Sequence, residues 1–167
     1  MIWLRRMLWI TTVVIVAGCS SSPLKENSII GIVTKVHDGD SIHITPAGAS
    51  RVVIRLAGID APEIAQAFGV ASRDTLRSMI LNQKAHARCH KKDQYQRQVC
   101  VVTAAGADIN LHMVQAGMAW HYKQYENEQS FSEKRQYSAA QKSAQRNKLG
   151  LWVQDAIAPW EFRQANR

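Results

Sequence analysis

Two short segments of the chain place acidic side chains at turns beside apolar runs. Residues 37–41 read His-Asp-Gly-Asp-Ser, and residues 55–63 read Arg-Leu-Ala-Gly-Ile-Asp-Ala-Pro-Glu. Carboxylates at Asp40, Asp60 and Glu63 have the chemistry to bind a hard divalent cation or to take a proton from water. Each segment taken singly also fits a structural role, because Asp-Gly is common in hairpin turns and Asp-x-Pro-Glu can cap a following helix.

A third segment, residues 93–97, reads Asp-Gln-Tyr-Gln-Arg and lies downstream of the other two. Taken together and in this order, the three segments resemble the signature blocks of the staphylococcal nuclease family. The resemblance extends along nearly the whole domain after the N-terminal segment, and the joint match is far more specific than any single block. It implies an enzyme that hydrolyses phosphodiester bonds.

The resemblance also implies a calcium site. The aspartates at the matching positions, Asp40 and Asp60, would bind Ca²⁺ together with the main-chain carbonyl of Ala61. The preference of this hard cation for oxygen ligands agrees with the assignment. Two protein carboxylates cannot complete the coordination shell, so waters and a substrate phosphate must supply the remaining ligands.

By the same resemblance, Arg55 and Arg97 approach the scissile phosphate, where forked guanidinium groups match phosphoryl oxygens and stabilise growing negative charge. Glu63 corresponds to the catalytic glutamate that orients or deprotonates the attacking water, and Tyr95 corresponds to a tyrosine that hydrogen-bonds a terminal phosphate. The implied reaction is in-line attack by water, with release of a 5′-hydroxyl and a 3′-phosphate.

The chain departs from the family pattern in two places. Gln96 stands where a glycine is usual just before the second arginine. Glycine permits backbone angles that glutamine resists, so the hairpin tip and the reach of Arg97 are open to change. The segment after Glu63 is also shorter than in the staphylococcal enzyme, which predicts a tighter loop beside the site.

The order of elements along the chain predicts an α+β fold on a five-stranded OB-type barrel with about three helices. β-Branched runs and turn residues indicate the strands, helical spacing indicates the first helix, and Asp108 and a Ser130–Glu133 capping box mark the starts of the later helices. The tail from Trp152 onward is predicted to be mostly irregular. The expected strands are 29–36, 41–45, 52–56, 85–90 and 99–103, and the expected helices are 65–81, 109–115 and 130–150.

The N-terminal 18 residues have the pattern of an export signal. Arg5 and Arg6 precede an apolar run that is too short to span a bilayer comfortably, and small residues lead up to Cys19. This arrangement resembles a bacterial lipobox, in which the signal is cut and the cysteine takes up lipid. A plain secretory signal with an incidental cysteine, or an uncleaved anchor, is the alternative.

Charge and cysteine content restrict the partners and the compartment. Without Arg5 and Arg6 the formal charge of +8 falls to +6, so the cation excess belongs to the mature domain and favours a polyanionic partner. Lipopolysaccharide and anionic phospholipid satisfy this charge as well as nucleic acid does. Cys89 and Cys100 remain after Cys19, and in an oxidising compartment a cross-strand disulfide is favoured over free thiols or metal binding.

We therefore expect a lipoprotein signal peptide at residues 1–18, a lipid-anchored tether at 19–28, a nuclease domain at 29–155 and an irregular tail at 156–167. The leading hypothesis is a monomeric, calcium-dependent endonuclease acting on DNA and RNA with little sequence preference. It would be held in the cell envelope by its lipid, at the outer membrane or periplasmic face in a Gram-negative cell. The alternatives are a non-catalytic, lipid-anchored nucleic-acid-binding barrel and, last, an envelope scaffold or inhibitor.

Overall fold

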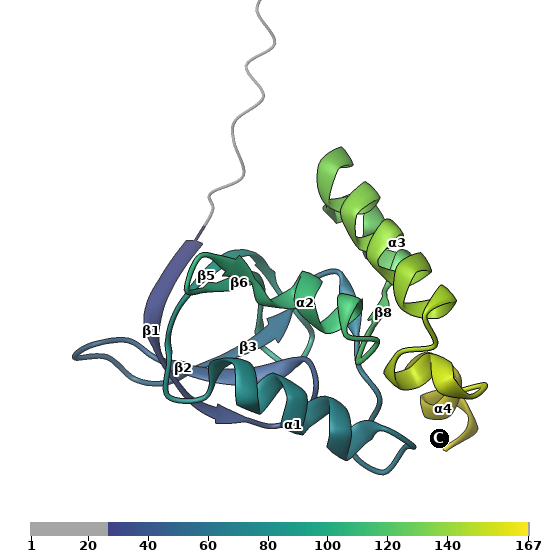
Figure 1. Cartoon of the computed structure of the whole chain (residues 1–167). Coiled ribbons are helices and arrows are strands. Elements are labelled where there is room, and N and C mark those ends of the chain that lie inside the picture. The colour runs from purple at the N-terminus through teal and green to yellow at the C-terminus, as the bar shows by residue number, and fades with distance from the viewer. Residues whose placement is uncertain (1–26, 167) are drawn as a thin grey trace, which may run out of the picture.

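The computed structural model describes residues 27–166, in which five main strands form one sheet that closes on itself (Figure 1). Neighbouring strands pair antiparallel in the order β3-β2-β1-β5-β6, and a parallel pairing between β3 and β6 completes the barrel. The predicted α+β fold on a five-stranded OB-type barrel is confirmed. The strands are β1 (Asn27–Val36), β2 (Ser41–Thr45), β3 (Val52–Leu56), β5 (Lys84–Lys92) and β6 (Gln98–Ala104), with the short β4 (Ile59–Asp60), β7 (Ala107–Asp108) and β8 (Trp120–His121).

Alternating side chains fill the barrel. Successive residues of a strand point to opposite faces, and β5 accordingly buries Ala85, Ala87 and Cys89 while it exposes the residues between them. β1 follows the same rule up to a β-bulge between Val33 and Lys35. β2 and β3 contribute Ile42, Ile44, Ile54 and Leu56 to the core, and these buried side chains anchor the acidic turns that flank the two strands.

Within residues 27–166, four α-helices and two 3₁₀ segments accompany the barrel, with α1 along one side and α3 and α4 together beyond one end (Figure 1). The Asp108 carboxylate caps α2 by accepting a hydrogen bond from the backbone N–H of Leu111, and Ser130 and Glu133 form a reciprocal capping box on α3, as predicted. The first helix begins at Gly69, later than expected, because residues 65–68 form turns. The helices are α1 (Gly69–Ile80), α2 (Ile109–Gln115), α3 (Phe131–Arg146) and α4 (Pro159–Ala165), and the 3₁₀ segments are η1 (Lys123–Glu128) and η2 (Gly150–Val153).

A fully buried amide ties α2 to the barrel. The Asn110 side chain donates to the carbonyls of Ala57 and Cys100 and accepts from the backbone N–H of Val102. A buried polar group is stabilising when its donors and acceptor are satisfied in this way. Asn110 therefore connects the segment after β3 to β6, on the side of the barrel where those two strands pair.

The structure corrects the predicted irregular tail and the last two residues of the predicted tether, whose other residues lie outside the described part of the chain. Residues 159–165 form α4, with Pro159 at the first helical turn, where its missing N–H has no cost. Trp160, Trp152 and Ala156 pack beside the buried Trp120 and Leu151 in a second, smaller apolar cluster. Tertiary docking therefore supports a helix too short to show a clear sequence period. At the other end β1 begins at Asn27, inside the predicted tether, because it pairs with β5 from that residue.

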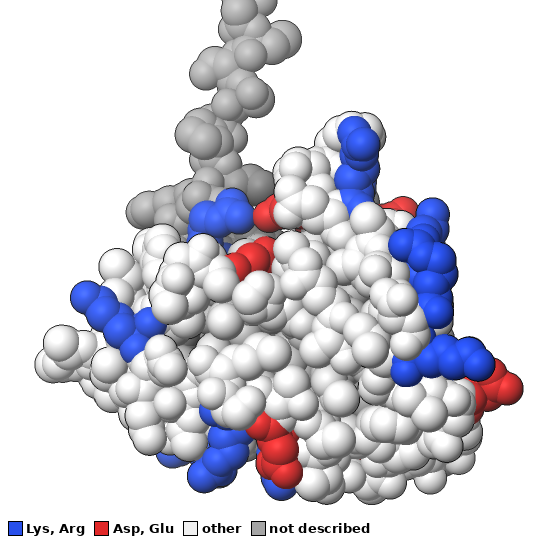
Figure 2. Space-filling model, viewed as in Figure 1, with Lys and Arg blue, Asp and Glu red and all other residues white. Residues whose placement is uncertain are grey.

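The face that carries α1 and α2 has no concentrated positive patch. Figure 2 shows lysines and arginines at separate places around the edge of this face, with a mostly uncharged centre. Net positive charge therefore does not by itself mark a binding surface on this side. Among residues 27–166, no helix has both the length and the apolar character needed to cross a membrane.

The predicted cross-strand disulfide is present. Cys89 on β5 and Cys100 on β6 are direct partners in the strand register, both are buried, and their sulfurs are bonded. The bond closes the hairpin whose tip carries residues 93–97.

We predict that a Cys89→Ala/Cys100→Ala double variant folds but loses about 3 kcal/mol of unfolding free energy, because the cross-link no longer restricts the unfolded chain. Urea unfolding followed by circular dichroism measures this loss. A reducing agent should destabilise the wild-type protein and leave the variant unchanged. Equal stability of the two proteins under oxidising conditions would contradict a stabilising role for the bond.

Candidate active site

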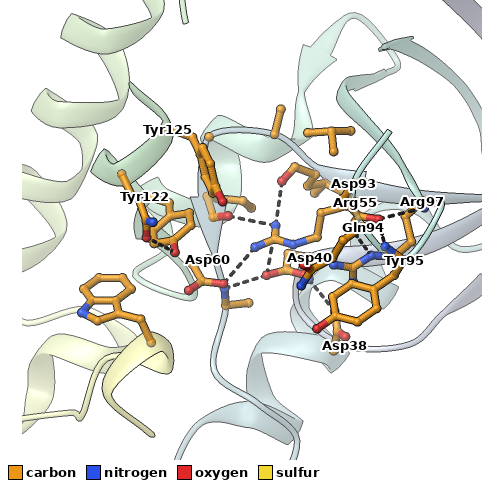
Figure 3. Close-up of a pocket in the computed structure, with 18 of the residues that line it drawn as sticks. Asp38, Asp40, Arg55, Asp60, Asp93, Gln94, Tyr95, Arg97, Tyr122 and Tyr125 are labelled. Carbon is orange, nitrogen blue, oxygen red and sulfur yellow. Dashed lines mark hydrogen bonds and ion pairs between the residues drawn. The ribbon is translucent and has the colours of Figure 1, made fainter. Parts of the chain in front are cut away.

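One open cavity of about 870 Å³ collects the side chains of all three acidic or basic segments (Figure 3). It lies between the barrel and the C-terminal part of the chain, which contributes Tyr122, Tyr125, Trp160 and Arg163. The sequence-predicted residues that line it are Asp40, Arg55, Asp60, Ala61, Glu63, Tyr95 and Arg97. The structure therefore brings every predicted catalytic, cation-binding and phosphate-binding residue to a single place.

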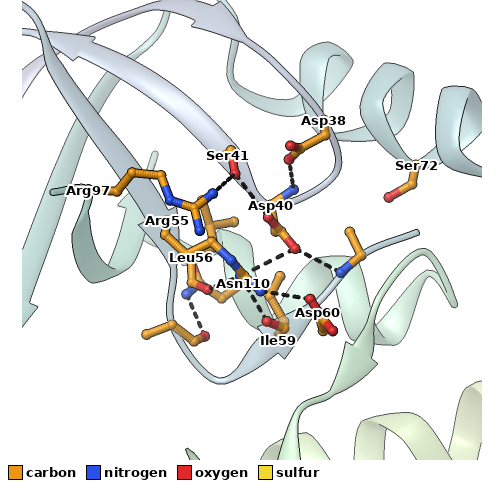
Figure 4. Close-up of polar contacts among 12 residues, drawn as sticks. Asp38, Asp40, Ser41, Arg55, Leu56, Ile59, Asp60, Ser72, Arg97 and Asn110 are labelled. Carbon is orange, nitrogen blue, oxygen red and sulfur yellow. Dashed lines mark hydrogen bonds and ion pairs between the residues drawn. The ribbon is translucent and has the colours of Figure 1, made fainter. Parts of the chain in front are cut away.

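Asp40 is held by short-range hydrogen bonds at the turn between β1 and β2 (Figure 4). Its Oδ2 accepts from the backbone N–H of Ala61 at 2.8 Å, and its Oδ1 accepts from the Ser41 hydroxyl at 3.0 Å. Asp38 in turn accepts from the backbone N–H of Asp40 at 2.9 Å. Gly39 between them has no room for a side chain, because a Cβ would lie 1.9 Å from the hydroxyl oxygen of Ser72 on α1.

Arg55 lies between the two buried aspartates and links them (Figure 4). Its Nη1 is 3.2 Å from Oδ2 of Asp40, and its Nη2 is 2.8 Å from Oδ1 of Asp60. Nη1 also donates to the main-chain carbonyls of Leu56 and Ile59, at 2.8 and 2.9 Å. The guanidinium is therefore anchored by backbone as well as by charge, and only 14% of the side chain is exposed.

The close approach of these carboxylates is electrostatically costly. Burial raises the pKa of Asp60, and the neighbouring Asp40 adds to the rise, against the opposing hydrogen bond from Arg163 and the charge of Arg55. Burial and the charge of Asp40 likewise raise the pKa of Asp38 to about 7. Clustered carboxylates in a water-poor site need cations beside them to stay ionised. The cluster is therefore a place where positive charge is strongly favoured.

Arg163, on α4, is the site residue that sequence reasoning missed. Its Nη2 lies 2.8 Å from Oδ2 of Asp60, and its Nη1 lies 2.8 Å from Oε1 of Glu63. Glu63 is further fixed by Gln66, whose side-chain oxygen accepts from the backbone N–H of Glu63 at 2.8 Å. A helix-start proline at Pro159 is the sequence signal that could have indicated α4, but nothing local indicates that Arg163 reaches Asp60.

Arg97 is directed by the hairpin that carries it. The Asp93 carboxylate accepts hydrogen bonds from the backbone N–H groups of Tyr95 and Arg97. It also forms an ion pair with Nε of Arg97 at 2.7 Å. Nη1 of Arg97 then reaches the Ser41 hydroxyl at 3.1 Å. Gln96 adopts the left-handed conformation, with φ of 64°, that a glycine would take without strain. The turn therefore keeps its shape despite the substitution, and Arg97 still enters the site.

Aromatic side chains form one wall of the cavity. Tyr122 stacks on Trp160 with ring centroids 5.5 Å apart, and Tyr125 contacts Tyr122 edge to face. Tyr125 is also covered by the ammonium group of Lys91 at 4.4 Å. Trp120 is 6% exposed and belongs to the second apolar cluster. Tyr95 is 70% exposed at the rim.

The donor chemistry of the site fits a hard cation. Asp40 and Asp60 offer carboxylate oxygens, and Ala61 adjoins both on the same wall of the cavity. Within residues 27–166 no cluster of three or more His, Cys, Asp or Glu side chains has metal-binding geometry. A hard cation bound here would therefore take much of its oxygen shell from water and phosphate.

A small OB-type barrel that gathers carboxylates and arginines in one open cavity is the architecture of a phosphodiester hydrolase. Residues 53–154 match the family described as staphylococcal nuclease homologues, and the chain belongs to this family. Its predicted class, a hydrolytic nuclease, is thereby confirmed.

Several relatives share most of the chain. An uncharacterized endonuclease of Haemophilus influenzae is 34% identical over 98% of this chain and 89% of its own. The micrococcal nuclease of Shigella flexneri is 35% identical over 82% of each chain. An uncharacterized endonuclease of Escherichia coli O157:H7 is 34% identical over 86% of this chain and 90% of its own.

We predict that Gln96→Gly raises the unfolding free energy by about 1 kcal/mol. Glycine removes the strain of the left-handed backbone at this position, and this gain is larger than the entropic cost of ordering glycine in the folded state. Thermal or urea unfolding measures the gain. Gln96→Ala is the matched control and should stay near the wild-type value, since alanine keeps the strain. A destabilised glycine variant would show that the Gln96 side chain itself supports the turn.

Proposed function

We propose that this protein is a calcium-dependent endonuclease that hydrolyses DNA and RNA with little sequence preference and leaves 3′-phosphate ends. The observation that carries the proposal is the convergence of Asp40, Asp60, Glu63 and two arginines on one cavity. A structural role for these residues as turns and caps does not require them to meet. Contacts to phosphate and sugar carry little sequence information, which supports low specificity.

Each residue has a distinct part in the proposed reaction. Asp40, Asp60 and the carbonyl of Ala61 would hold Ca²⁺, which when bound supplies electrophilic polarisation of the phosphoryl group. Arg97 presents a forked guanidinium to phosphoryl oxygens, in an orientation that Asp93 maintains. Arg55 supplies a second guanidinium and also keeps the two aspartates together. Both arginines therefore stabilise charge that grows on the phosphate as water attacks.

Glu63 would orient or deprotonate the attacking water in this proposal. Its side chain is 40% exposed on the cavity wall. Gly69 packs closely against the backbone of the Glu63 loop, since a Cβ at residue 69 would lie 1.9 Å from the carbonyl oxygen of Glu63, and this contact fixes the loop. Tyr95 stands at the rim, where it would hydrogen-bond a terminal phosphate. Tyr122 and Trp160 offer aromatic faces on which bases would stack, a sequence-tolerant way to hold single strands.

The proposal extends to the location of the protein. Export, lipid attachment at Cys19 and a place in the cell envelope rest on the pattern of residues 1–22, which lie outside the described residues. The disulfide supports an oxidising compartment. We expect the anchored domain to act as a monomer, because one chain supplies every site residue named above.

We predict that cleavage of single-stranded and duplex DNA requires Ca²⁺ and stops when a chelator is added. The cleavage rate should fall by about a hundredfold or more in Glu63→Gln, because the glutamine cannot accept a proton from water. Gel-based cleavage assays and circular dichroism measure activity and fold. Glu161→Gln, an exposed carboxylate on α4, is the matched control and should cleave like the wild-type protein.

Two results would contradict this function. Cleavage by Glu63→Gln at the wild-type rate would remove Glu63 from the reaction. Tight binding of DNA without cleavage under calcium, magnesium or any other divalent ion would instead support the non-catalytic binding barrel.

We predict that Cys19→Ser abolishes lipid attachment, because serine lacks the thiol that accepts the diacylglycerol. Metabolic labelling with a radioactive fatty acid, followed by membrane fractionation, measures the loss. The Cys89→Ala/Cys100→Ala variant is the control and should still take up label. Equal labelling of Cys19→Ser would show that the lipid is absent or attached elsewhere.

A further inference from the structure

Arg163 bridges two carboxylates that have different roles in the proposed reaction. Its Nη2 pairs with Oδ2 of Asp60, and its Nη1 pairs with Oε1 of Glu63 and lies 3.4 Å from Oδ1 of Asp60. Asp60 is the proposed calcium ligand and Glu63 the proposed base. A single guanidinium thus occupies the space between the cation site and the residue that handles water.

Both oxygens of Asp60 are engaged by guanidinium groups. Oδ1 accepts from Arg55 and Oδ2 accepts from Arg163, each at 2.8 Å, and the Asp60 side chain is only 2% exposed. A cation that binds Asp60 would therefore compete with the two arginines for its buried oxygens. Release of one positive partner would make room for the cation.

Arg163 is the partner that can leave. Arg55 is 14% exposed and is also bound to two main-chain carbonyls, so its movement would break several contacts. Arg163 is 39% exposed, and its guanidinium pairs with the carboxylates of Asp60 and Glu63. Arg163 lies on α4, a helix of seven residues that packs through Trp160. The segment that leads into α4 is connected to the Glu63 loop by a hydrogen bond from the Gln66 side chain to the carbonyl of Ile157.

We propose that Arg163 is an internal counter-ion that neutralises Asp60 and Glu63 before the cation arrives. When a divalent cation binds, it displaces Arg163 from Asp60. The inference rests on the proposed calcium-binding role of Asp60. Arg163 stabilises the empty site and opposes its filling, so it raises the calcium concentration at which the protein becomes loaded. This role makes Arg163 a positioning residue, distinct from Arg55 and Arg97, which face the phosphate.

The test measures calcium binding in the absence of nucleic acid, with the purified protein. Isothermal titration calorimetry and calcium-dependent thermal unfolding are applied to wild type, Arg163→Gln, Arg163→Lys and Lys92→Gln. Lys92 is an exposed lysine that lines the same cavity, so Lys92→Gln removes one positive charge there without touching Asp60 or Glu63. Arg163→Lys keeps the charge but loses the fork that spans both carboxylates.

Two opposite shifts are expected from Arg163→Gln. In chelator its unfolding temperature falls below that of wild type, because a buried carboxylate has lost a partner. With calcium its affinity rises about tenfold, since the cation no longer displaces a charge-assisted hydrogen bond. Arg163→Lys should lie between the two, and Lys92→Gln should change affinity by less than about twofold, as expected for an exposed charge.

A purely structural role for α4 predicts a different pattern. Undocking of the helix would lower stability and leave calcium affinity unchanged or weaker, and that result for both Arg163 variants would overturn the inference. If wild type cleaves DNA with calcium while Arg163→Gln binds calcium no more tightly, the inference fails and the nuclease function stands. If calcium neither binds nor raises the unfolding temperature of wild type and Arg163→Gln, the calcium assignment fails together with the inference.

Discussion

The parallel pairing of β3 with β6 is the contact on which the site depends. It places Arg55 opposite Val99, two residues after Arg97, while the antiparallel pairing of β2 with β3 places Arg55 opposite Ser41, next to Asp40. Segments that are tens of residues apart in sequence therefore become neighbours around one strand. Asn110 supports this closure from α2 by bonding to the chain on both sides of the pairing. A sheet of the same strands left open at this edge would separate the arginines from each other.

Closure also creates the electrostatic problem that the rest of the site solves. Asp40 and Asp60 are both buried, and burial together with the charge of Asp40 raises the pKa of Asp60. Arg55 compensates from β3, where backbone carbonyls hold its guanidinium. Arg163 compensates from outside, on a helix that the second apolar cluster docks. The site thus combines a fixed cation built into the sheet with a more exposed cation carried by the C-terminal helix.

Local signals predicted much of this architecture correctly. β-Branched runs and turn residues indicated the strands, and the Asp108 cap and the Ser130–Glu133 box marked helix starts that the structure confirms. Where such signals were weak the prediction was wrong. The tail lacks a clear helical period because α4 has only seven residues, and the helix forms through packing of Trp160 against Trp120 and Tyr122. Gln96 shows the reverse case, since the surrounding hairpin imposes a conformation that its residue type disfavours.

The sequence by itself determined the chemistry of the candidate site. Carboxylates at Asp40, Asp60 and Glu63 and guanidiniums at Arg55 and Arg97 stand in short segments whose types and order are sufficient to identify the family. Tertiary structure alone decided how these charges are balanced. Arg163 is 103 residues from Asp60 and 100 from Glu63, and no local pattern specifies an ion pair over such a distance. The pairing arises because hydrophobic packing brings α4 to the cavity that collects the site residues. There the buried negative charge attracts the nearest available cation.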